Sequence, residues 1–229
     1  LVAASASGGL EIVNELLSAG ADKDAKRKVD FSTALYFAAS GGHVEIVKRL
    51  LSEGCDVGWK NSRGFTALSA AVESACKFNP TEFAKTVTIE SFLEILRLLN
   101  AAGADTETTS LNGWTPLLTA SRNGCVPMVK DLLSIKANAL FSVGVGKRGI
   151  TPILAACMGP YPVIVDMLLK AGASANATEA GAKPPLLTAC TPAPKKRKGL
   201  NGSGAAAVVP SVVKGDGDED GLGDGKGEG

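Results

Sequence analysis

GGHVEIVKRLLSEGCD, at residues 41–56, is the clearest copy of a segment that recurs five times along the chain. Within it, Ile46, Val47 and Leu50 follow the spacing of a buried helical face. Glycines precede the helix, and Gly54 closes it, because glycine takes the left-handed conformation at little steric cost. The segment therefore predicts a short amphipathic helix bounded by glycines. The other copies occupy residues 8–22, 92–105, 124–138 and 159–174.

A second recurring element precedes each later copy and predicts a second helix. Its versions are STALYFAAS at 32–40, FTALSAAVE at 65–73, WTPLLTASR at 114–122 and ITPILAACM at 150–158. A threonine stands near the start of each, where its hydroxyl can accept a bond from the first helical turn; these are Thr33, Thr66, Thr115 and Thr151. The threonines lie 33, 49 and 36 residues apart, so a pair of helices recurs with a period near 33.

This period, with a T-P-L-type helix start, resembles the ankyrin-repeat family over roughly residues 1–190. The resemblance implies an all-α solenoid of stacked helix–turn–helix units with projecting β-hairpin-like turns. The first residue falls inside a helix, so the chain is interpreted as a fragment or internal segment. The expected units are roughly 1–28, 29–61, 62–110, 111–146 and 147–179, with a half unit at 180–190 that TPAP at 191–194 stops.

The third unit is expected to contain an insertion at about 75–90, because its threonine spacing is 49 residues rather than 33. Pro80 is expected to end or kink the first helix, and the second helix is expected to resume near Ile89. Insertions in repeats often lie on the binding face. A tolerated surface loop is the alternative, since loop length costs little free energy. A second, smaller expansion lengthens the turn at 141–147.

Composition limits where the protein works. The chain has 45% hydrophobic and 5% aromatic residues and a formal net charge of +1. It has no apolar run of the length a transmembrane helix needs, so we expect no membrane insertion in this segment. The five cysteines form no C-x-x-C pair, which favours a reducing, intracellular compartment, cytoplasmic or nuclear.

Enzymatic and metal-binding patterns are not found. His43 is the only histidine, and no cysteine is expected at an activated position. GVGKRG at 144–149 lacks the spacing of a phosphate loop. Asp216, Asp218 and Asp220 match half of a calcium loop, but glycine stands at 227 where its glutamate is required. We therefore expect no enzyme activity, no cofactor or metal, and no small-molecule substrate.

The segment 191–229 differs from the rest in composition. It begins with a basic cluster and ends in a Gly/Asp-rich stretch, so it is predicted to be a disordered tail. The cluster resembles a nuclear-import signal, and a solvated charge run is the alternative; its residues are Lys195, Lys196, Arg197 and Lys198. Neither the tail nor the body has a basic excess, so nucleic acid is not the expected partner.

The resemblance implies that the partner is another protein, bound by turn tips and by the concave face of the inner helices. Carried over by repeat position, the candidate residues are Arg63, Phe65, Glu73, Asn112, Trp114, Arg122, Asn123, Arg148 and Ile150. Phe65, Trp114 and Ile150 are expected side by side near solvent, as in an interface hot spot. Packing of each ring against its own turn is the alternative. Phe31 stands where a turn glycine belongs, which leaves the shape of that turn open.

The sequence thus predicts a protein–protein interaction module, a scaffold or adaptor. An alternative remains that the segment recruits substrates for, or regulates, a larger enzyme or channel whose working domain lies outside this chain.

Overall fold

The computed structural model describes residues 1–77, 87–142 and 149–175. The chain divides into two compact units, Leu1–Pro192 and Ala193–Gly229. The second unit, with the predicted tail, lies outside the described residues, as do the predicted half unit at 180–190 and most of the insertion. In the described part of Leu1–Pro192, the chain forms helices and turns without a β-strand.

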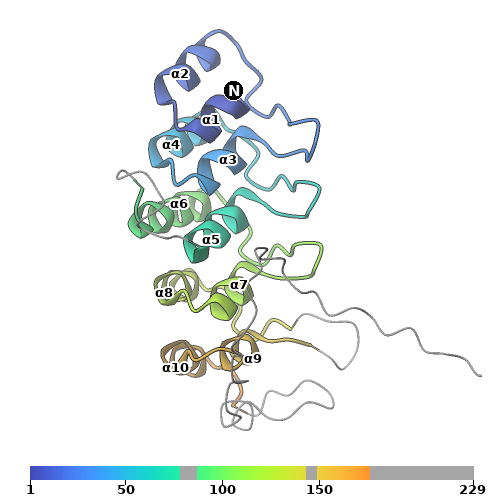
Figure 1. The fold of residues 1–229 in the computed structure, drawn as a ribbon, viewed down its shortest axis with the longest axis vertical. Helices are drawn as coiled ribbons and strands as arrows, with labels where there is room; N and C mark the ends of the chain where they lie inside the picture. The colour runs from blue at the N-terminus through green and yellow to red at the C-terminus, as the bar shows by residue number, and fades with distance from the viewer. Residues whose placement is uncertain (78–86, 143–148, 176–229) are drawn as a thin grey trace, which may run out of the picture. The chain divides into compact units, whose positions relative to one another are not determined.

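The helices come in five successive pairs (Figure 1). The pairs are α1 (Val2–Ser7) with α2 (Leu10–Ser18), α3 (Ala34–Ser40) with α4 (Val44–Ser52), α5 (Ala67–Lys77) with α6 (Ile89–Ala101), α7 (Pro116–Asn123) with α8 (Val126–Ser134), and α9 (Pro152–Cys157) with α10 (Pro162–Lys170).

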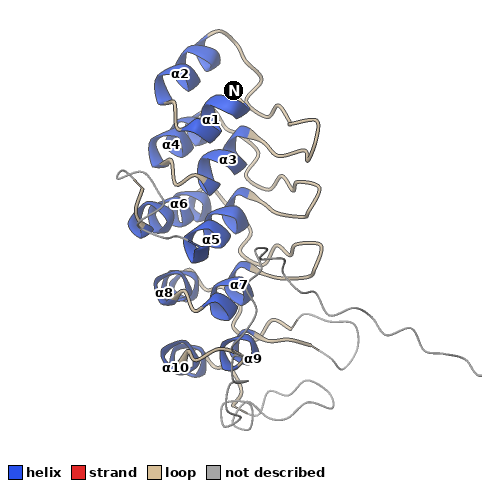
Figure 2. Ribbon diagram, in the orientation of Figure 1, coloured by secondary structure: helices blue, strands red, loops and turns tan. Residues whose placement is uncertain are grey.

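The pairs stack in two rows. Each odd-numbered helix packs against the next odd-numbered helix, and each even-numbered helix against the next even-numbered one. Figure 2 shows the turns, in tan, projecting from the odd-numbered row. The predicted stack of helix–turn–helix units is therefore confirmed.

Side-chain size explains why the odd-numbered helices approach each other closely. Fully buried alanines such as Ala38, Ala39 and Ala71 lie on these helices. The even-numbered helices contribute larger side chains such as Leu50 and Phe92, both 0% exposed. Together they form one continuous apolar core that runs from unit to unit, so each pair of helices is stabilised mainly by its neighbours.

Threonines begin α3, α7 and α9 as predicted. The Thr33 hydroxyl accepts a bond from the Tyr36 N–H at 3.3 Å, and the Thr115 hydroxyl accepts one from the Leu118 N–H at 3.3 Å. Thr151 does the same for the Leu154 N–H at 3.4 Å. Each cap satisfies a helix donor that would otherwise have no partner.

The glycines between the helices of a pair make room for a ring. A Cβ atom on Gly8 would lie 2.7 Å from Cε1 of His43, so the imidazole covers the glycine of the preceding unit. The Tyr161 ring covers Gly124 in the same way, three units later. These residues are the N-caps of α4 and α10, so at both places the residue just before an even-numbered helix fills the junction between two units.

Neighbouring turns are joined through their backbones. The Ser62 N–H donates to the Asp30 carbonyl at 2.9 Å, and the Leu111 N–H donates to the Arg63 carbonyl at 3.0 Å. Phe31 has φ 57°, close to the 77° of Gly64 in the next turn. The first turn therefore keeps a left-handed residue in the glycine's place, at a cost of about 1–2 kcal/mol for a residue with a Cβ.

Carboxylates join the loops at the base of the turns. Asp24 accepts a bond from the Asp56 N–H at 2.9 Å, and Glu107 accepts one from the Asn138 N–H at 2.8 Å. These carboxylates are bound to the backbone of the next unit, and so help to hold consecutive units together.

The insertion connects α5 to α6, at the opposite helix ends from the projecting turns. Helix α6 begins at Ile89, as predicted, and Thr88 caps it together with Ser91. Val87 packs against the apolar core. Residues 78–86, which include Pro80, lie outside the described residues, so the role of the insertion stays a prediction.

Candidate functional site

Aromatic and cationic side chains gather on the turns and the odd-numbered helices. We call this set, together with the adjoining Met158, the basic–aromatic surface. Its exposed or half-buried members are Arg27, Phe37, Arg63, Phe65, Trp114, Arg122 and Met158, and Tyr36 is its buried member. The contacts described below divide it into a first group in the second and third units, and a second group in the fourth and fifth.

In the first group, one guanidinium connects two neighbouring units. Arg63 donates to the Tyr36 hydroxyl at 3.1 Å, and its Cζ lies 5.3 Å from the centre of the Phe65 ring. The Tyr36 ring packs edge to face against Phe37, with centroids 5.3 Å apart. Cation–π and edge-to-face contacts of this kind hold the side chains in defined orientations. Arg63 is nevertheless exposed.

Arg27 extends the first group at the preceding turn. Its Cζ lies 4.8 Å from the centre of the Phe37 ring, and its Nε donates to the Asp30 carboxylate at 2.8 Å. The guanidinium holds the pKa of the Asp30 carboxyl well below its usual range, because it donates to the charged form. The pair is thus a fixed salt bridge at neutral pH.

A tryptophan at the base of the next turn supports the unusual turn at Phe31. The Trp59 Nε1 donates to the Phe31 carbonyl at 2.7 Å. Lys26 lies over the Trp59 ring, with Nζ 3.3 Å from its centre. The Trp59 hydrogen bond to the Phe31 carbonyl helps explain why the left-handed conformation of Phe31 persists.

In the second group, Arg122 connects α7 to the end of α9. Its Cζ lies 5.9 Å from the centre of the Trp114 ring, and its Nη1 lies 3.4 Å from Sδ of Met158. The Trp114 backbone is fixed by a pair of bonds with Ser110, because the Ser110 N–H donates to the Trp114 carbonyl at 3.1 Å and the Trp114 N–H donates to Oγ at 3.3 Å. The ring is therefore presented by a rigid turn.

The predicted stripe of large apolar residues lies outside the core. Phe65, Trp114 and Ile150 are all half-buried, and none belongs to the continuous apolar cluster. No contact joins the Phe65 ring to Trp114 directly. Their turns are nevertheless adjacent, since a Cβ atom on Gly64 would lie 2.8 Å from the Leu111 N.

The remaining candidates have local partners or lie elsewhere. Glu73 forms a salt bridge with Lys77 at 2.6 Å, and Asn123 donates to the Thr119 carbonyl of its own helix at 2.9 Å. Asn112 is exposed at a turn tip. Outside the described residues lie Arg148, Lys195, Lys196, Arg197 and Lys198. Their predicted roles stay predictions.

Ser32 stands directly before the threonine of its unit, as Phe65, Trp114 and Ile150 do in theirs. It is fully buried. Its hydroxyl accepts a bond from the Asn61 side-chain amide at 3.2 Å. The structure therefore gives Ser32 a place in the packing of two turns rather than on a contact surface.

Sequence reasoning did not select Arg27, Tyr36 and Phe37. A signal for the two rings exists, because STALYFAAS has an aromatic pair where the other copies have serine, alanine, leucine or threonine. The sequence reasoning placed Leu111 at a turn tip, where it is 77% exposed, but it did not select Val29, which is 83% exposed. Val29 has no counterpart among the candidate positions because the turn at Phe31 lacks its glycine.

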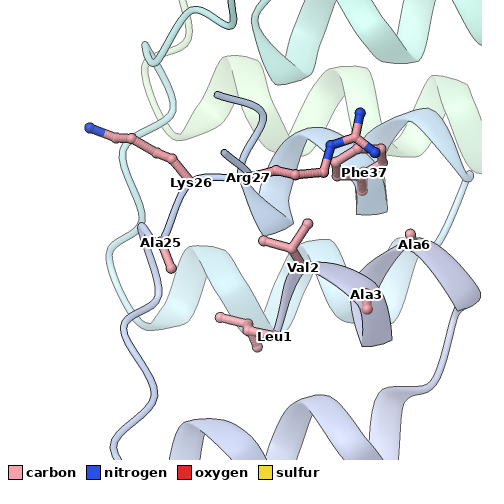
Figure 3. A pocket seen from close by; sticks show the side chains of 8 residues that line it. All are labelled: Leu1, Val2, Ala3, Ala6, Ala25, Lys26, Arg27 and Phe37. Atoms are coloured by element: carbon pink, nitrogen blue, oxygen red, sulfur yellow. The ribbon is translucent and has the colours of Figure 1, made fainter. Parts of the chain in front are cut away.

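A hollow of about 440 Å³ adjoins the first group (Figure 3). It is lined on one side by Val2, Ala3 and Ala6 of α1, and on the other by Lys26, Arg27 and Phe37. In Figure 3 the Arg27 guanidinium lies beside the Phe37 ring, whereas the Lys26 ammonium points away. The hollow thus continues the basic–aromatic surface towards α1.

One cysteine departs from the expectation that none is activated. Cys125 lies at the N-terminus of α8, and a hydrogen bond with the Cys76 thiol lowers the pKa of Cys125 to about 7. The same contact raises the pKa of Cys76, and burial raises the pKa of Cys55 to about 12. Cys125 is therefore the thiol most readily ionised near neutral pH in the described part of the chain.

Within the described residues, no three histidine, cysteine or carboxylate side chains are grouped as a metal site would require. None of the described helices has the length and apolar character to span a bilayer.

A known family model matches the first 179 residues. The family model described as ankyrin repeats (3 copies) matches residues 1–87 and 85–179. The search of curated proteins gave no match.

Proposed function

Because the chain belongs to the ankyrin-repeat family, we propose that it is a scaffold or adaptor that binds a partner protein through its basic–aromatic surface. Ankyrin repeats are generally protein–protein interaction modules, and they are typically not catalytic. The proposal adds which face of this chain contacts the partner.

The observation that carries the proposal is the position of Trp114 and Phe65. Both rings are half-buried, both lie beside an arginine, and both are outside the apolar core. Large aromatic side chains contribute to stability mainly when they pack in the core. Rings that a fold holds rigidly at its surface beside arginine have the composition of an interface hot spot.

The exposed apolar tips support the same face. Val29, Phe31, Leu111 and Met158 are each more than half exposed, and they belong to turns or to the end of α9. The even-numbered row also has exposed apolar side chains, namely Ile12, Val163 and Leu169. These stand without an arginine–aromatic contact among the described residues. Single apolar residues on a surface are common and need no partner.

The proposal includes an intracellular location. Cys55, Cys76, Cys125 and Cys157 are all free thiols, which suits a reducing compartment.

Affinity capture from cell extract with matched variants tests the function. Three forms of the chain are immobilised: the unaltered chain, Trp114→Ala on the proposed surface, and Leu169→Ala on α10. We expect a partner that the unaltered chain and Leu169→Ala retain and that Trp114→Ala releases. Equal retention of every captured protein by all three forms would rule out the basic–aromatic surface as the binding face.

A further inference from the structure

The tips of the turns carry more basic than acidic residues. We use the term turn side for the turn tips with two positions each of α5 and α7, namely residues 26–31, 60–65, 73–74, 110–114 and 122–123. These ranges contain six basic and two acidic residues, whereas the loop bases outside them carry Asp22, Asp24, Asp56, Asp105 and Glu107. The even-numbered helices contain five basic and seven acidic residues. The turn side is therefore cationic, although the formal net charge of the whole chain is only +1.

Of the side chains that the structure describes, fewer basic ones on the turn side form salt bridges than on the even-numbered helices. On the even-numbered helices, Lys48 pairs with Glu45 and Glu94, and Arg97 pairs with Asp131. On the turn side, both acidic residues are already engaged, Asp30 by Arg27 and Glu73 by Lys77.

The two arginines that hold the aromatic rings keep their charge available. Among the described residues, neither Arg63 nor Arg122 has a carboxylate partner, and both are exposed. Within the described part of the chain, Arg63 uses one donor on the Tyr36 hydroxyl, and the guanidinium of Arg122 has a ring and a thioether as its partners. Each guanidinium is held in a fixed place with further donors unused. This arrangement suits bidentate recognition of a carboxylate.

An uncharged stretch separates these two arginines. The turn at 110–114 has the sequence SLNGW and carries no charge. It presents Leu111, which is 77% exposed, and the half-buried Trp114 ring. The surface therefore alternates: cationic at the turns of the second and third units, apolar at the next turn, and cationic again at Arg122.

From this alternation we infer that the partner supplies an extended peptide segment in which acidic residues flank apolar ones. Its carboxylates pair with Arg63 and Arg122, and its apolar side chains lie on Leu111 and Trp114. The inference rests on the proposed function, and it adds the chemistry of the segment that is bound.

A nucleic acid fits this pattern less well. Its phosphates are evenly spaced along the backbone and release counterions wherever a cation meets them, which favours a continuous basic track. Here the uncharged turn interrupts the cations.

The test uses the full chain and a displayed library of random peptides of about 14 residues, selected for binding at about 0.15 M salt. We expect the enriched peptides to be acidic, with apolar residues between the acidic ones. The affinity of the best peptide is then measured by fluorescence polarisation. Arg122→Glu should weaken it about ten-fold or more, and raising the salt concentration should weaken it further.

Lys130→Glu is the matched control, because it makes the same change of charge in the same unit, on the exposed face of α8. It should change the affinity less than about two-fold. Circular dichroism of both variants shows whether the helices are retained. Arg63→Glu, in the first group, should repeat the effect of Arg122→Glu.

Several outcomes would overturn the inference. Enrichment of neutral or basic peptides would do so, and so would equal effects of Arg122→Glu and Lys130→Glu. Failure to enrich any peptide would exclude an extended segment as the ligand. Binding of a single-stranded RNA of about 20 nucleotides, with the same loss in Arg122→Glu, would favour a nucleic acid instead. If neutral peptides bind and Trp114→Ala weakens them, the proposed function stands and only the acidic partner fails.

Discussion

Arg122 lies over the Trp114 ring, with Cζ 5.9 Å from the ring centre, and the same side chain reaches Met158 in the following unit. The contact joins the turn before α7, the end of α7 and the end of α9. It places a large ring and a charge next to each other on a surface outside the core. The first prediction follows from this position.

Trp114→Ala should weaken binding of the captured partner by more than about 1 kcal/mol, because the ring is presented as a contact rather than as core. The free energy of unfolding should change by less than about 1 kcal/mol, since the ring lies outside the apolar cluster. Calorimetric titration and urea denaturation measure the two quantities. An equal loss of both would make Trp114 a structural residue.

Gly64→Ala should destabilise the fold more than Gly54→Ala does. Both glycines have a positive φ, 77° and 70°, so each alanine costs about 1–2 kcal/mol in backbone strain. At Gly64 the new Cβ would also lie 2.8 Å from the Leu111 N, whereas at Gly54 no atom lies within 4 Å. We expect an additional loss of about 1–3 kcal/mol at Gly64, measured by urea denaturation. Equal losses would show that the contact between neighbouring turns relaxes without cost.

Lys136→Gly should stabilise the protein. Lys136 follows α8 with φ 64°, where the other units have glycines such as Gly54 and Gly103. Glycine removes the backbone strain but gives the unfolded chain more conformational entropy. The net effect should be a rise of about 0.5–1 kcal/mol in the free energy of unfolding.

Lys130→Gly, in the interior of α8, is the comparison for that change. It should lower the free energy of unfolding by about 1 kcal/mol, because a helix interior favours other residues over glycine. A destabilisation by both substitutions would contradict the assignment of strain to Lys136.

Cys125 should be alkylated faster than Cys55 at about pH 7.5, because a thiolate is the reactive form. Its rate should level off above its pKa of about 7, whereas the rate for Cys55, with a pKa of about 12, should still rise. Peptide mapping after iodoacetamide treatment over a pH series measures both. Cys76→Ala removes the hydrogen bond and should shift the Cys125 profile to higher pH. An unshifted profile would show that Cys76 does not lower the pKa.

The helices and their starts were predictable because their signals are local. A threonine followed by small and apolar residues predicts a capped helix, and the Thr115 bond to the Leu118 N–H spans only three residues. Apolar spacing over one or two turns predicted the buried faces of α4, including Ile46 and Leu50. The start of α6 near Ile89 was predicted in the same way.

The turn at Phe31 shows where such reasoning stops. The sequence indicated only that a glycine was missing, which left the conformation open. The structure keeps the left-handed conformation, supported by the Trp59 bond to the Phe31 carbonyl from 28 residues away. A residue's local preference therefore yields where a neighbouring unit fixes its backbone.

The candidate site was predicted only as a set of repeat positions. Trp114, Phe65, Arg63 and Arg122 were selected because the family resemblance points to turns and inner helices. Their contact roles stay predictions. The contact of Arg63 with Tyr36, 27 residues earlier, depends on how one unit sits on the next.

The sequence by itself determined that helices recur in pairs, where each begins, and which of their faces are apolar. These features follow from interactions within a few residues along the chain. Only the tertiary structure decided that Arg63 meets the Tyr36 hydroxyl and that Arg122 lies between the Trp114 ring and Met158. Arg63 and Tyr36 are 27 residues apart and Arg122 and Met158 are 36 apart, so the packing of one unit on the next brings each pair together.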